Sequence, residues 1–579
     1  MDVLLAAFHR IRLEDGRNAD IVPSPHIKVR IPNFCNVAAG SKTRLNLSVL
    51  VSRLPPEVLT KIISIVAVLD PPFAPQGKHK GSLGWIQTTH VCRYWRDVIL
   101  GDPVPWARVV CTFLSLDVAT EMLERAGDVP LVLKVAHPAS ATALQEFALN
   151  LVQRASRIVW TIDEQNGGIN ALARWMRALS EINLPDLENL EFKYTGEVPE
   201  DAFLSSMPSL RATRLRHVVL KGIYIPFRPS TALTELSLDT ASMVWTSDRG
   251  RQFFSLLGQA PNLEILHLRG EAVPSAVPRS TRPRVALPKL KQLLLAHADG
   301  QRCVQFWRAL SASPSEYMLL ETDLATRESL DLVFDTLHPR LARVHAIRGL
   351  RLLGRSDRAD ITFFEDAFVV PLHLDVPNPH LLSAAPQDHW FTHGVRLKLG
   401  YTGDGRSESV LVNVLLAMYR KLDLSRLEVV HLETAKELNV LEYANVLAPM
   451  KNLVGLSVGD VGTPNLYAAL QPPTSSIPVP VAAATPRARQ AVLLPRLKWM
   501  IPGASVLHRS RADANLPILG LLAARAIHGC ALKTLRLRAD AVSFMPVMEK
   551  EAAVGEVKRK FPDMKLEVVE VVGIGKRHR

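Results

Sequence analysis

The stretch Leu263-Glu264-Ile265-Leu266-His267-Leu268 decides how most of this chain of 579 residues folds. Its leucines follow the pattern L-x-x-L-x-L, and the last two stand two positions apart, as side chains on one face of a strand do. The lead-in Ala260-Pro261-Asn262 comes directly before the first leucine. The stretch predicts a short strand whose leucines point inward and pack on a neighbouring strand.

The same pattern returns along the chain, with other apolar residues in place of some leucines. Copies start at Leu187, Leu233, Leu263, Leu290, Leu427, Leu453 and Leu532, with a weaker copy over Leu210–Leu215 and a faint one over Ile347–Leu352. From Leu187 to Leu290 the starts, the weaker copy included, lie 23, 23, 30 and 27 residues apart. Leucine-rich repeats have a period of about 20–29 residues and this strand signature, so the region resembles them.

Between the expected strands, apolar residues recur at helical spacing. Helices are predicted over residues 248–257, 302–310, 407–419 and 436–447, on the outer side of the strands. The asparagine that usually follows each strand is replaced at four positions, by Thr195, Ala241, Glu271 and Asp540. Without that side-chain ladder we expect irregular turns. The predicted fold class is therefore α/β, an irregular leucine-rich-repeat-like solenoid preceded by a small all-α domain.

The small helical domain is predicted from a second stretch near the N-terminus. Leu54-Pro55-Pro56-Glu57 opens an apolar run through Leu69, and proline suits the first turn of a helix because its missing N–H costs nothing there. Asp70-Pro71-Pro72 ends this helix. A second helical stripe is predicted over residues 83–98, followed by a break at Asp102-Pro103.

These residues resemble the F-box domain. The family opens with Leu-Pro-x-Glu and continues with Val-Cys-Arg-x-Trp and a later Trp, and Leu54–Glu57, Val91–Trp95 and Trp106 match in this order. Gly84-Trp85-Ile86 resembles the variant common in fungal F-box proteins, and the loop 71–82 is longer than in compact F-boxes. The resemblance covers about a tenth of the chain.

The resemblance implies that this domain binds a Skp-family adaptor and, through it, a cullin. The implied adaptor-binding residues are Leu54, Pro55, Glu57, Val58, Ile62, Val91, Cys92, Trp95 and Trp106. Leu54 and Pro55 are the first choices for direct contact, and Val58 and Ile62 fit either the core or the contact surface. Trp95 and Trp106 are equally consistent with core aromatic residues.

Four segments are expected in chain order. Residues 1–50 form a weakly ordered extension, 51–110 the F-box-like domain, 111–183 a connecting α/β segment, and 184–575 the repeat-like domain, with a proline-rich loop at 471–490. Residues 271–286 and 320–405 interrupt the repeats.

Composition and motifs narrow the function. The net charge is +13, and the basic clusters at 558–560 and 576–579 are small, so we expect no nucleic-acid partner. The chain contains no phosphate-binding loop, GxGxxG, HExxH or GxSxG motif, and we expect neither an enzyme nor a metal or cofactor site.

Cys92 as a nucleophile would need a base and an electropositive pocket, and a packed apolar role is expected instead. Five cysteines without a CxxC pair, and the absence of a long apolar run, predict a cytoplasmic or nuclear protein that does not enter a membrane.

The sequence therefore predicts a substrate-recognition subunit of an SCF-type cullin–RING ubiquitin ligase. The F-box-like domain would hold the adaptor while the repeats bind a protein substrate of unknown identity. The alternative is a non-catalytic repeat scaffold that acts outside the ubiquitin ligase.

Overall fold

The structure is a computed structural model of all 579 residues. It describes residues 54–74, 81–135, 142–162, 168–196, 209–228, 230–241, 245–275, 285–312, 317–323, 327–343, 348–354, 358–364, 394–400, 410–434, 438–458, 463–471, 493–501, 517–538 and 547–569. The expected extension 1–50 and nearly all of the proline-rich loop 471–490 lie outside these ranges. The chain divides into two compact units, Met1–Trp106 and Ala107–Arg579.

The described part of the first unit is helical. Helix α3 (Pro56–Leu69) begins at a proline and ends before Asp70, as the sequence predicts. The second predicted helix is divided in two, a 3₁₀-helix over Gly84–His90 and α4 (Arg93–Gly101), because Cys92 adopts an extended conformation between them. The hydroxyls of Thr88 and Thr89 donate to carbonyls three residues earlier and accompany the tighter 3₁₀ turns. A short helix, α5 (Pro103–Ala107), carries Trp106.

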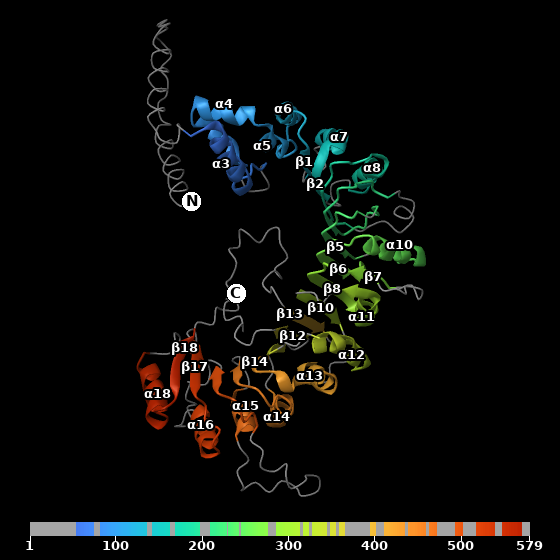
Figure 1. The fold of residues 1–579 in the computed structure, drawn as a ribbon. Coiled ribbons are helices and arrows are strands. Elements are labelled where there is room, and N and C mark those ends of the chain that lie inside the picture. The colour runs from blue at the N-terminus through green and yellow to red at the C-terminus, as the bar shows by residue number, and fades with distance from the viewer. Residues whose placement is uncertain are drawn as a thin grey trace, which may run out of the picture. The chain divides into compact units, whose positions relative to one another are not determined.

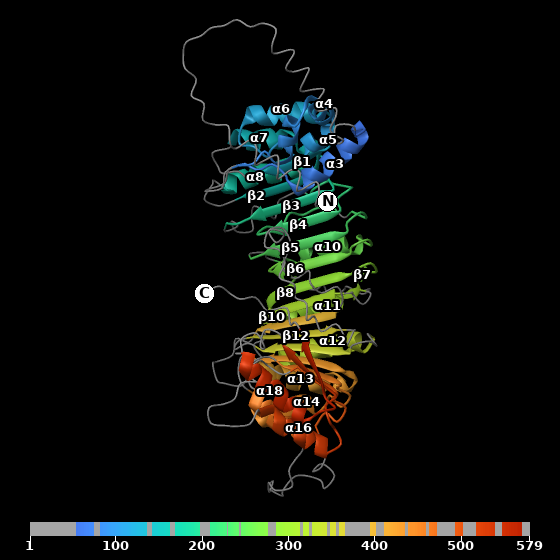
Figure 2. The ribbon, with the colours of Figure 1, turned by 90° about the vertical axis from the view of Figure 1, so that its left-hand side faces the viewer.

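The second unit is built on one sheet. Sixteen strands of the described residues are hydrogen-bonded in the order β1-β2-β3-β4-β5-β6-β8-β10-β13-β12-β11-β14-β15-β16-β17-β18. They span Leu131–Val135 (β1), Ala155–Ile162 (β2), Asn189–Tyr194 (β3), His217–Lys221 (β4), Glu235–Thr240 (β5), Ile265–Gly270 (β6), Gln292–Asp299 (β8), Tyr317–Asp323 (β10), Gly349–Gly354 (β11), Arg358–Phe364 (β12), Gly394–Gly400 (β13), Val429–Thr434 (β14), Gly455–Val458 (β15), Trp499–Ile501 (β16), Thr534–Arg538 (β17) and Lys565–Val569 (β18). A separate pair joins β7 (Val285–Leu287) to β9 (Leu310–Ala312). Figure 2 shows the strands of the large sheet stacked as successive rungs.

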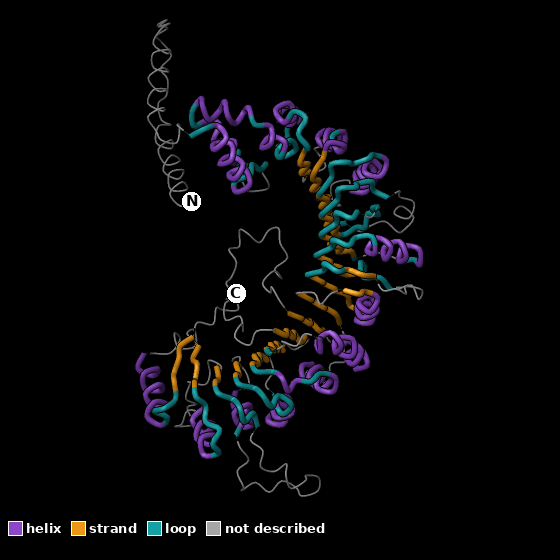
Figure 3. Tube along the Cα trace, viewed as in Figure 1, coloured by secondary structure: helices purple, strands orange, loops and turns teal. Residues whose placement is uncertain are grey.

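Helices separate many, but not all, of the consecutive strands along the described chain. They are α6 (Leu116–Ala126), α7 (Thr142–Asn150), α8 (Gly168–Glu181), α10 (Ser247–Gly258), α11 (Gly300–Ala309), α12 (Arg327–Arg343), α13 (Val410–Lys421), α14 (Val440–Leu447), α15 (Thr463–Leu470), α16 (Pro517–Ile527) and α18 (Val547–Lys560). Within the second unit, helices such as α8, α11 and α13 lie along one side of the sheet (Figures 1 and 3). The predicted α/β class is therefore confirmed, with mainly parallel strands and helices that cover one face.

The strand leucines build the core of the second unit. Leu236, Leu238, Leu266 and Leu268 are all fully buried. On the N-terminal strands the indole of Trp160 in β2 packs 4.3 Å from that of Trp175 in α8, which shows that the buried positions face the helices. The alternate positions of each strand lie on the opposite face, here called the helix-free face.

Most of the described repeats enter their strand through the same backbone turn. The first leucine of the pattern donates to the carbonyl three residues earlier, for example Leu233 N to Ser230 O at 3.1 Å and Leu453 N to Met450 O at 3.1 Å. The carbonyl of the residue after that leucine accepts two N–H groups from the next repeat; Thr234 O, for instance, accepts from Glu264 N and Ile265 N at 2.8 and 3.0 Å. Repeated backbone bonds of this kind hold consecutive repeats in register.

Two asparagines bond to the backbone of the preceding repeat, at a position before the strand and not after it. Asn262 Nδ2 donates to Thr231 O and Asn452 Nδ2 to Ser425 O, each at 2.7 Å. Both asparagines stand directly before the first leucine of their repeat. These two side chains therefore stabilise the turns that lead into β6 and β15.

Three expectations about the repeats need correction. The weaker copy placed at Leu210–Leu215 is not the strand; β4 follows it, and its buried pattern is Leu215-x-x-Val218-x-Leu220. The helix predicted from residue 436 starts at Val440, because Asn439 and Glu442 form a reciprocal capping box. The segment 111–183, expected to connect two domains, contributes β1 and β2 to the same sheet.

The interruption at residues 320–405 is a meander inside the sheet. Strand β12 pairs antiparallel with both β11 and β13, whereas β13 lies parallel to β10 and β11 lies parallel to β14. The chain therefore reverses direction twice between β10 and β14, and the rest of the sheet keeps one direction.

Candidate functional site

A hydrogen bond joins the two halves of the N-terminal motif. The Tyr94 hydroxyl, in the first turn of α4, donates to the Leu54 carbonyl at 2.6 Å, just before α3 begins. At the other end of α3, Trp85 N donates to Asp70 O at 2.9 Å. Gly84 has φ +52°, and a Cβ at this position would lie 2.4 Å from Asp70 O, so only glycine fits. These contacts fix α3 against the segment that follows it.

Three tryptophans fill the interior of the first unit. The rings of Trp85 and Trp106 meet edge to face at 4.9 Å, and Trp106 Nε1 donates to Ile99 O at 2.9 Å. Trp95 is also buried. Trp95 and Trp106 are among the expected adaptor-binding residues. In this structure both lie in the core and not at the surface.

The other expected residues lie at or near the surface. Pro55 and Glu57 are exposed, and Val58 and Val91 keep 43% and 42% of their surface exposed. Leu54, Ile62 and Cys92 are half-buried.

Helix α3 is apolar on two faces. Leu59, Ile63 and Ala67 are buried in the unit. A second set, the α3 stripe, consists of Val58, Ile62, Ile65 and Leu69. Its steps of four, three and four residues place it along one line of the helix, and Ile65 and Leu69 are 47% and 66% exposed. The apolar run that predicts α3 therefore covers two faces of the helix, and only the face of Leu59, Ile63 and Ala67 is buried.

Exposed apolar side chains gather in the first unit. Among the described residues, nine of the fourteen large apolar side chains with high exposure lie between Val58 and Val104. Phe73 and Leu83 belong to this set, and an antiparallel bridge between Phe73 and Ser82 holds them near the end of α3. Because large exposed apolar side chains are concentrated in this unit, it is the candidate interaction region of the described chain.

The described residues offer little for covalent or metal chemistry. Burial raises the pKa of the Cys111 and Cys303 thiols to about 12, so neither is a nucleophile near neutral pH. No group of three His, Cys, Asp or Glu side chains in the described ranges is arranged to hold a metal ion. None of the helices described is both long and apolar enough to cross a membrane.

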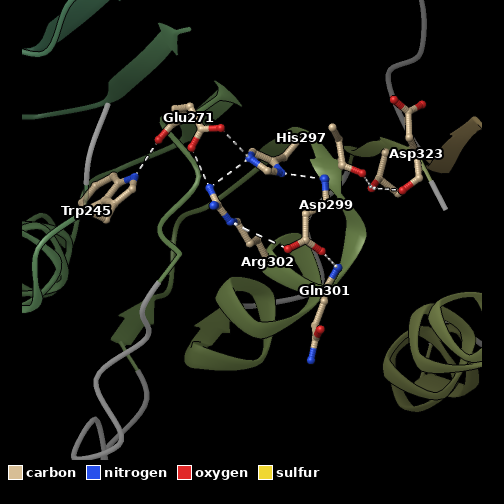
Figure 4. A network of polar contacts seen from close by, with 9 residues as sticks. Trp245, Glu271, His297, Asp299, Gln301, Arg302 and Asp323 are labelled. Atoms are coloured by element: carbon tan, nitrogen blue, oxygen red, sulfur yellow. Dashed lines mark hydrogen bonds and ion pairs between the residues drawn. The ribbon is translucent and has the colours of Figure 1, made fainter. Parts of the chain in front are cut away.

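A polar network lies where β6 and β8 end, shown in Figure 4. Arg302 Nη1 donates to Glu271 Oε2 at 2.6 Å, and Trp245 Nε1 donates to the Glu271 carbonyl at 2.6 Å. His297 Nδ1 accepts the Asp299 amide at 2.7 Å, and its Nε2 lies 3.3 Å from Glu271 Oε1 and 3.1 Å from Arg302 Nη1. The bonds of this network join the residues that follow β6, the end of β8 and the first turn of α11. The network therefore holds these strand ends and α11 together.

Comparison with known proteins finds no protein family and no curated protein that matches the chain. One similar solved structure is the leucine-rich repeat-containing protein LegL7 from Legionella pneumophila, with 14% identity and a TM-score of 0.25. That match covers 64% of this chain and 86% of that one. The description of the second unit as a leucine-rich-repeat-like solenoid follows from its own buried leucines and strand order.

Proposed function

We propose that the chain is a substrate-recognition subunit of an SCF-type ubiquitin ligase, and that its first unit docks on a Skp-family adaptor. The α3 stripe carries this proposal. An apolar helix face that its own unit leaves exposed fits a groove or a second helix on a partner. The motif order Leu54–Glu57, Val91–Trp95 and Trp106, which resembles the F-box, supplies the identity of that partner.

In this role the second unit captures the substrate. Its sheet offers a long surface of side chains on the helix-free face, as solenoids used for binding do. The chain itself makes and breaks no bond. It raises the effective concentration of substrate lysines near a charged ubiquitin-conjugating enzyme that the adaptor and cullin bring close.

The first test is co-expression of the full chain with a Skp-family adaptor, followed by size-exclusion chromatography. The wild-type chain should elute with the adaptor in one complex. The double variant Val58→Asp/Ile65→Asp should lose it, because two aspartates in an apolar contact cost the complex roughly a hundredfold or more in affinity.

Leu441→Asp is the matched control. Leu441 lies in α14 of the second unit and is 69% exposed, so the same chemical change occurs away from the stripe. This variant should keep the adaptor, and circular dichroism should show that both variants remain folded. Retention of the adaptor by a folded Val58→Asp/Ile65→Asp chain would exclude the stripe as the docking surface.

Cullin in the purified complex separates the proposal from the alternative scaffold role. Adaptor without cullin favours a scaffold that acts outside the ligase. A chain that ignores the adaptor would exclude the ligase proposal and leave the repeat scaffold with unknown partners.

A further inference from the structure

The helix-free face at the N-terminal end of the sheet carries an excess of positive charge. On β1 to β4 the buried positions alternate with exposed or half-buried ones, so this face is open to solvent. It holds four cations, here called the basic face: Lys134, Arg157, Lys193 and Lys221. Glu191 is the one acidic side chain on the same four strands of this face.

Two of these cations stand directly opposite each other. The register of β3 and β4 pairs Lys193 with Lys221, and both side chains are exposed. Like charges at facing positions of neighbouring strands destabilise a sheet. Neither lysine forms an ion pair within the part of the chain that the structure describes. On its other side Lys221 faces Asp239 of β5, whereas Lys193 faces the neutral Thr161 of β2. The uncompensated positive charge of the pair therefore lies on the Lys193 side, where it is available to an anionic ligand.

The charges around Lys134 also indicate an excess of positive charge on this face. Desolvation by its neighbours, and then the nearby Arg157 and Arg108, hold the pKa of Lys134 below its usual value. Glu191 opposes this shift and also approaches Arg157 at 3.5 Å, so one carboxylate serves two cations. Beyond β4 the sign changes, because Glu235 and Asp239 occupy this face of β5.

Apolar residues lie among the cations. Val132, Val159 and Val219 are half-buried on the same face, and it carries no Phe, Tyr or Trp on β1 to β4. Proteins that bind single-stranded nucleic acid stack bases on aromatic side chains, which are missing here. Valines between cations instead suit a peptide that alternates acidic and aliphatic residues. Four strands at about 4.8 Å spacing give a surface roughly 15 Å across, wide enough for a short segment of chain.

We propose that the basic face binds an acidic segment of a partner protein, whose carboxylates or phosphates approach Lys193 and Lys221 together. In the proposed receptor role, on which the biological meaning of this inference rests, the segment belongs to the substrate. The binding itself needs no adaptor and is measured without one.

The test uses fluorescence anisotropy with the full chain and four labelled probes. They are a peptide of about a dozen residues that alternates Glu and Leu, its Gln counterpart, a version with phosphoserine in place of several Glu, and an oligouridylate of similar charge. The Glu peptide should bind and the Gln peptide should not, and binding should weaken as salt rises from about 0.05 to 0.3 M. Tighter binding of the phosphoserine peptide would assign the preferred anion to phosphate, and equal binding would assign it to carboxylate; both support the proposal.

The decisive variant is Lys193→Ala/Lys221→Ala. It should weaken the Glu peptide roughly five- to tenfold, because each exposed charge pair contributes at most about one factor of five. It should not lower the melting temperature, since it removes a repulsive pair. The matched control Lys558→Ala/Arg559→Ala removes the same charge from exposed positions of α18 and should change binding less than about twofold.

Three results would overturn the inference: equal losses in both double variants, no loss in either, or an oligouridylate bound more tightly than the peptides and released by Lys193→Ala/Lys221→Ala. Adaptor binding is scored separately on the same proteins. A chain that ignores the adaptor but binds the Glu peptide through Lys193 and Lys221 would refute the ligase proposal and leave the basic face intact.

Discussion

The Tyr94 hydroxyl and the Leu54 carbonyl, forty positions apart in the chain, lie 2.6 Å from each other. This bond ties the start of α3 to the first turn of α4. It fixes the first helical turn that carries Val58, and through it the direction of the α3 stripe. A single side chain thus links the two motif segments that the sequence separates by the long loop after α3.

Tyr94→Phe should loosen this link without disturbing the ring's packing. The lost hydrogen bond contributes about 1 kcal/mol, so amides of α3 should exchange with solvent roughly five times faster. Hydrogen exchange followed by mass spectrometry measures this effect in the full chain. Unchanged exchange in α3, compared with peptides from β5 as an internal reference, would show that the bond does not hold the helix.

Gly84→Ala should destabilise the first unit by about 2 kcal/mol or more, because the new Cβ meets the Asp70 carbonyl in a left-handed backbone. Gly101→Ala is the control, since a Cβ there meets nothing within 4 Å. It should be neutral or slightly stabilising at the end of α4. Denaturant unfolding followed by tryptophan fluorescence distinguishes them, because Trp85 is adjacent to Gly84 in the chain. Equal stability of the two variants would contradict the close approach.

Thiol labelling gives a footprint of the proposed adaptor surface. Cys92 and Cys530 are half-buried, whereas Cys111 and Cys303 are buried with pKa values raised to about 12. Of these four cysteines, iodoacetamide at pH 8 should therefore modify Cys92 and Cys530 first. Added adaptor should slow the modification of Cys92 and leave Cys530 unchanged. Protection of both thiols, or of neither, would argue against contact at the Val91–Trp95 segment.

Acid should weaken the C-terminal strands. Hydrogen bonds from Lys565 and Arg536 lower the pKa of Glu567 below its ordinary value of 4.5. A lowered folded-state pKa contributes stability above that ordinary value, and the contribution is lost as pH falls through the folded-state pKa. Hydrogen exchange in β17 and β18 should therefore accelerate between about pH 5 and pH 3 more in the wild type than in Glu567→Gln. Glu551→Gln, an exposed position in α18, should behave like the wild type.

Local patterns made much of the fold predictable. Leu236 and Leu238 are separated by one residue, and this spacing alone identifies an inward strand face. The position of strand β4 was not predicted, for two reasons. Val218 replaces the second leucine of its pattern, and Pro208, two residues before Leu210, resembles the prolines that precede the first leucine of other copies. The antiparallel β12 depends on contacts with β11 and β13 that no local pattern encodes.

The sequence predicted which segments form the candidate site, but not which face of α3 is exposed. Val58, Leu59, Ile62 and Ile63 are all apolar, so periodicity finds a helix without showing which side is buried. Packing of the 3₁₀-helix and α4 against one side of α3 decides which side is buried, and this depends on the whole unit. The basic face could not be predicted from the sequence for a related reason. Lys193 and Lys221 are 28 positions apart, and only the register of β3 and β4 brings them together.

The meander of β11, β12 and β13 limits how this array could grow or shrink. Two reversals of chain direction cancel, so β10 and β14 point the same way although three strands stand between them. Loss of all three strands as one block would bring β10 and β14 together with matching polarity. Loss of β11 or β13 alone would instead place the reversed β12 directly against β14 or β10, and loss of β12 alone would require a crossover in place of two hairpin reversals. Here the three strands together form the unit whose loss leaves the rest of the sheet with one direction and without a new crossover inside the meander.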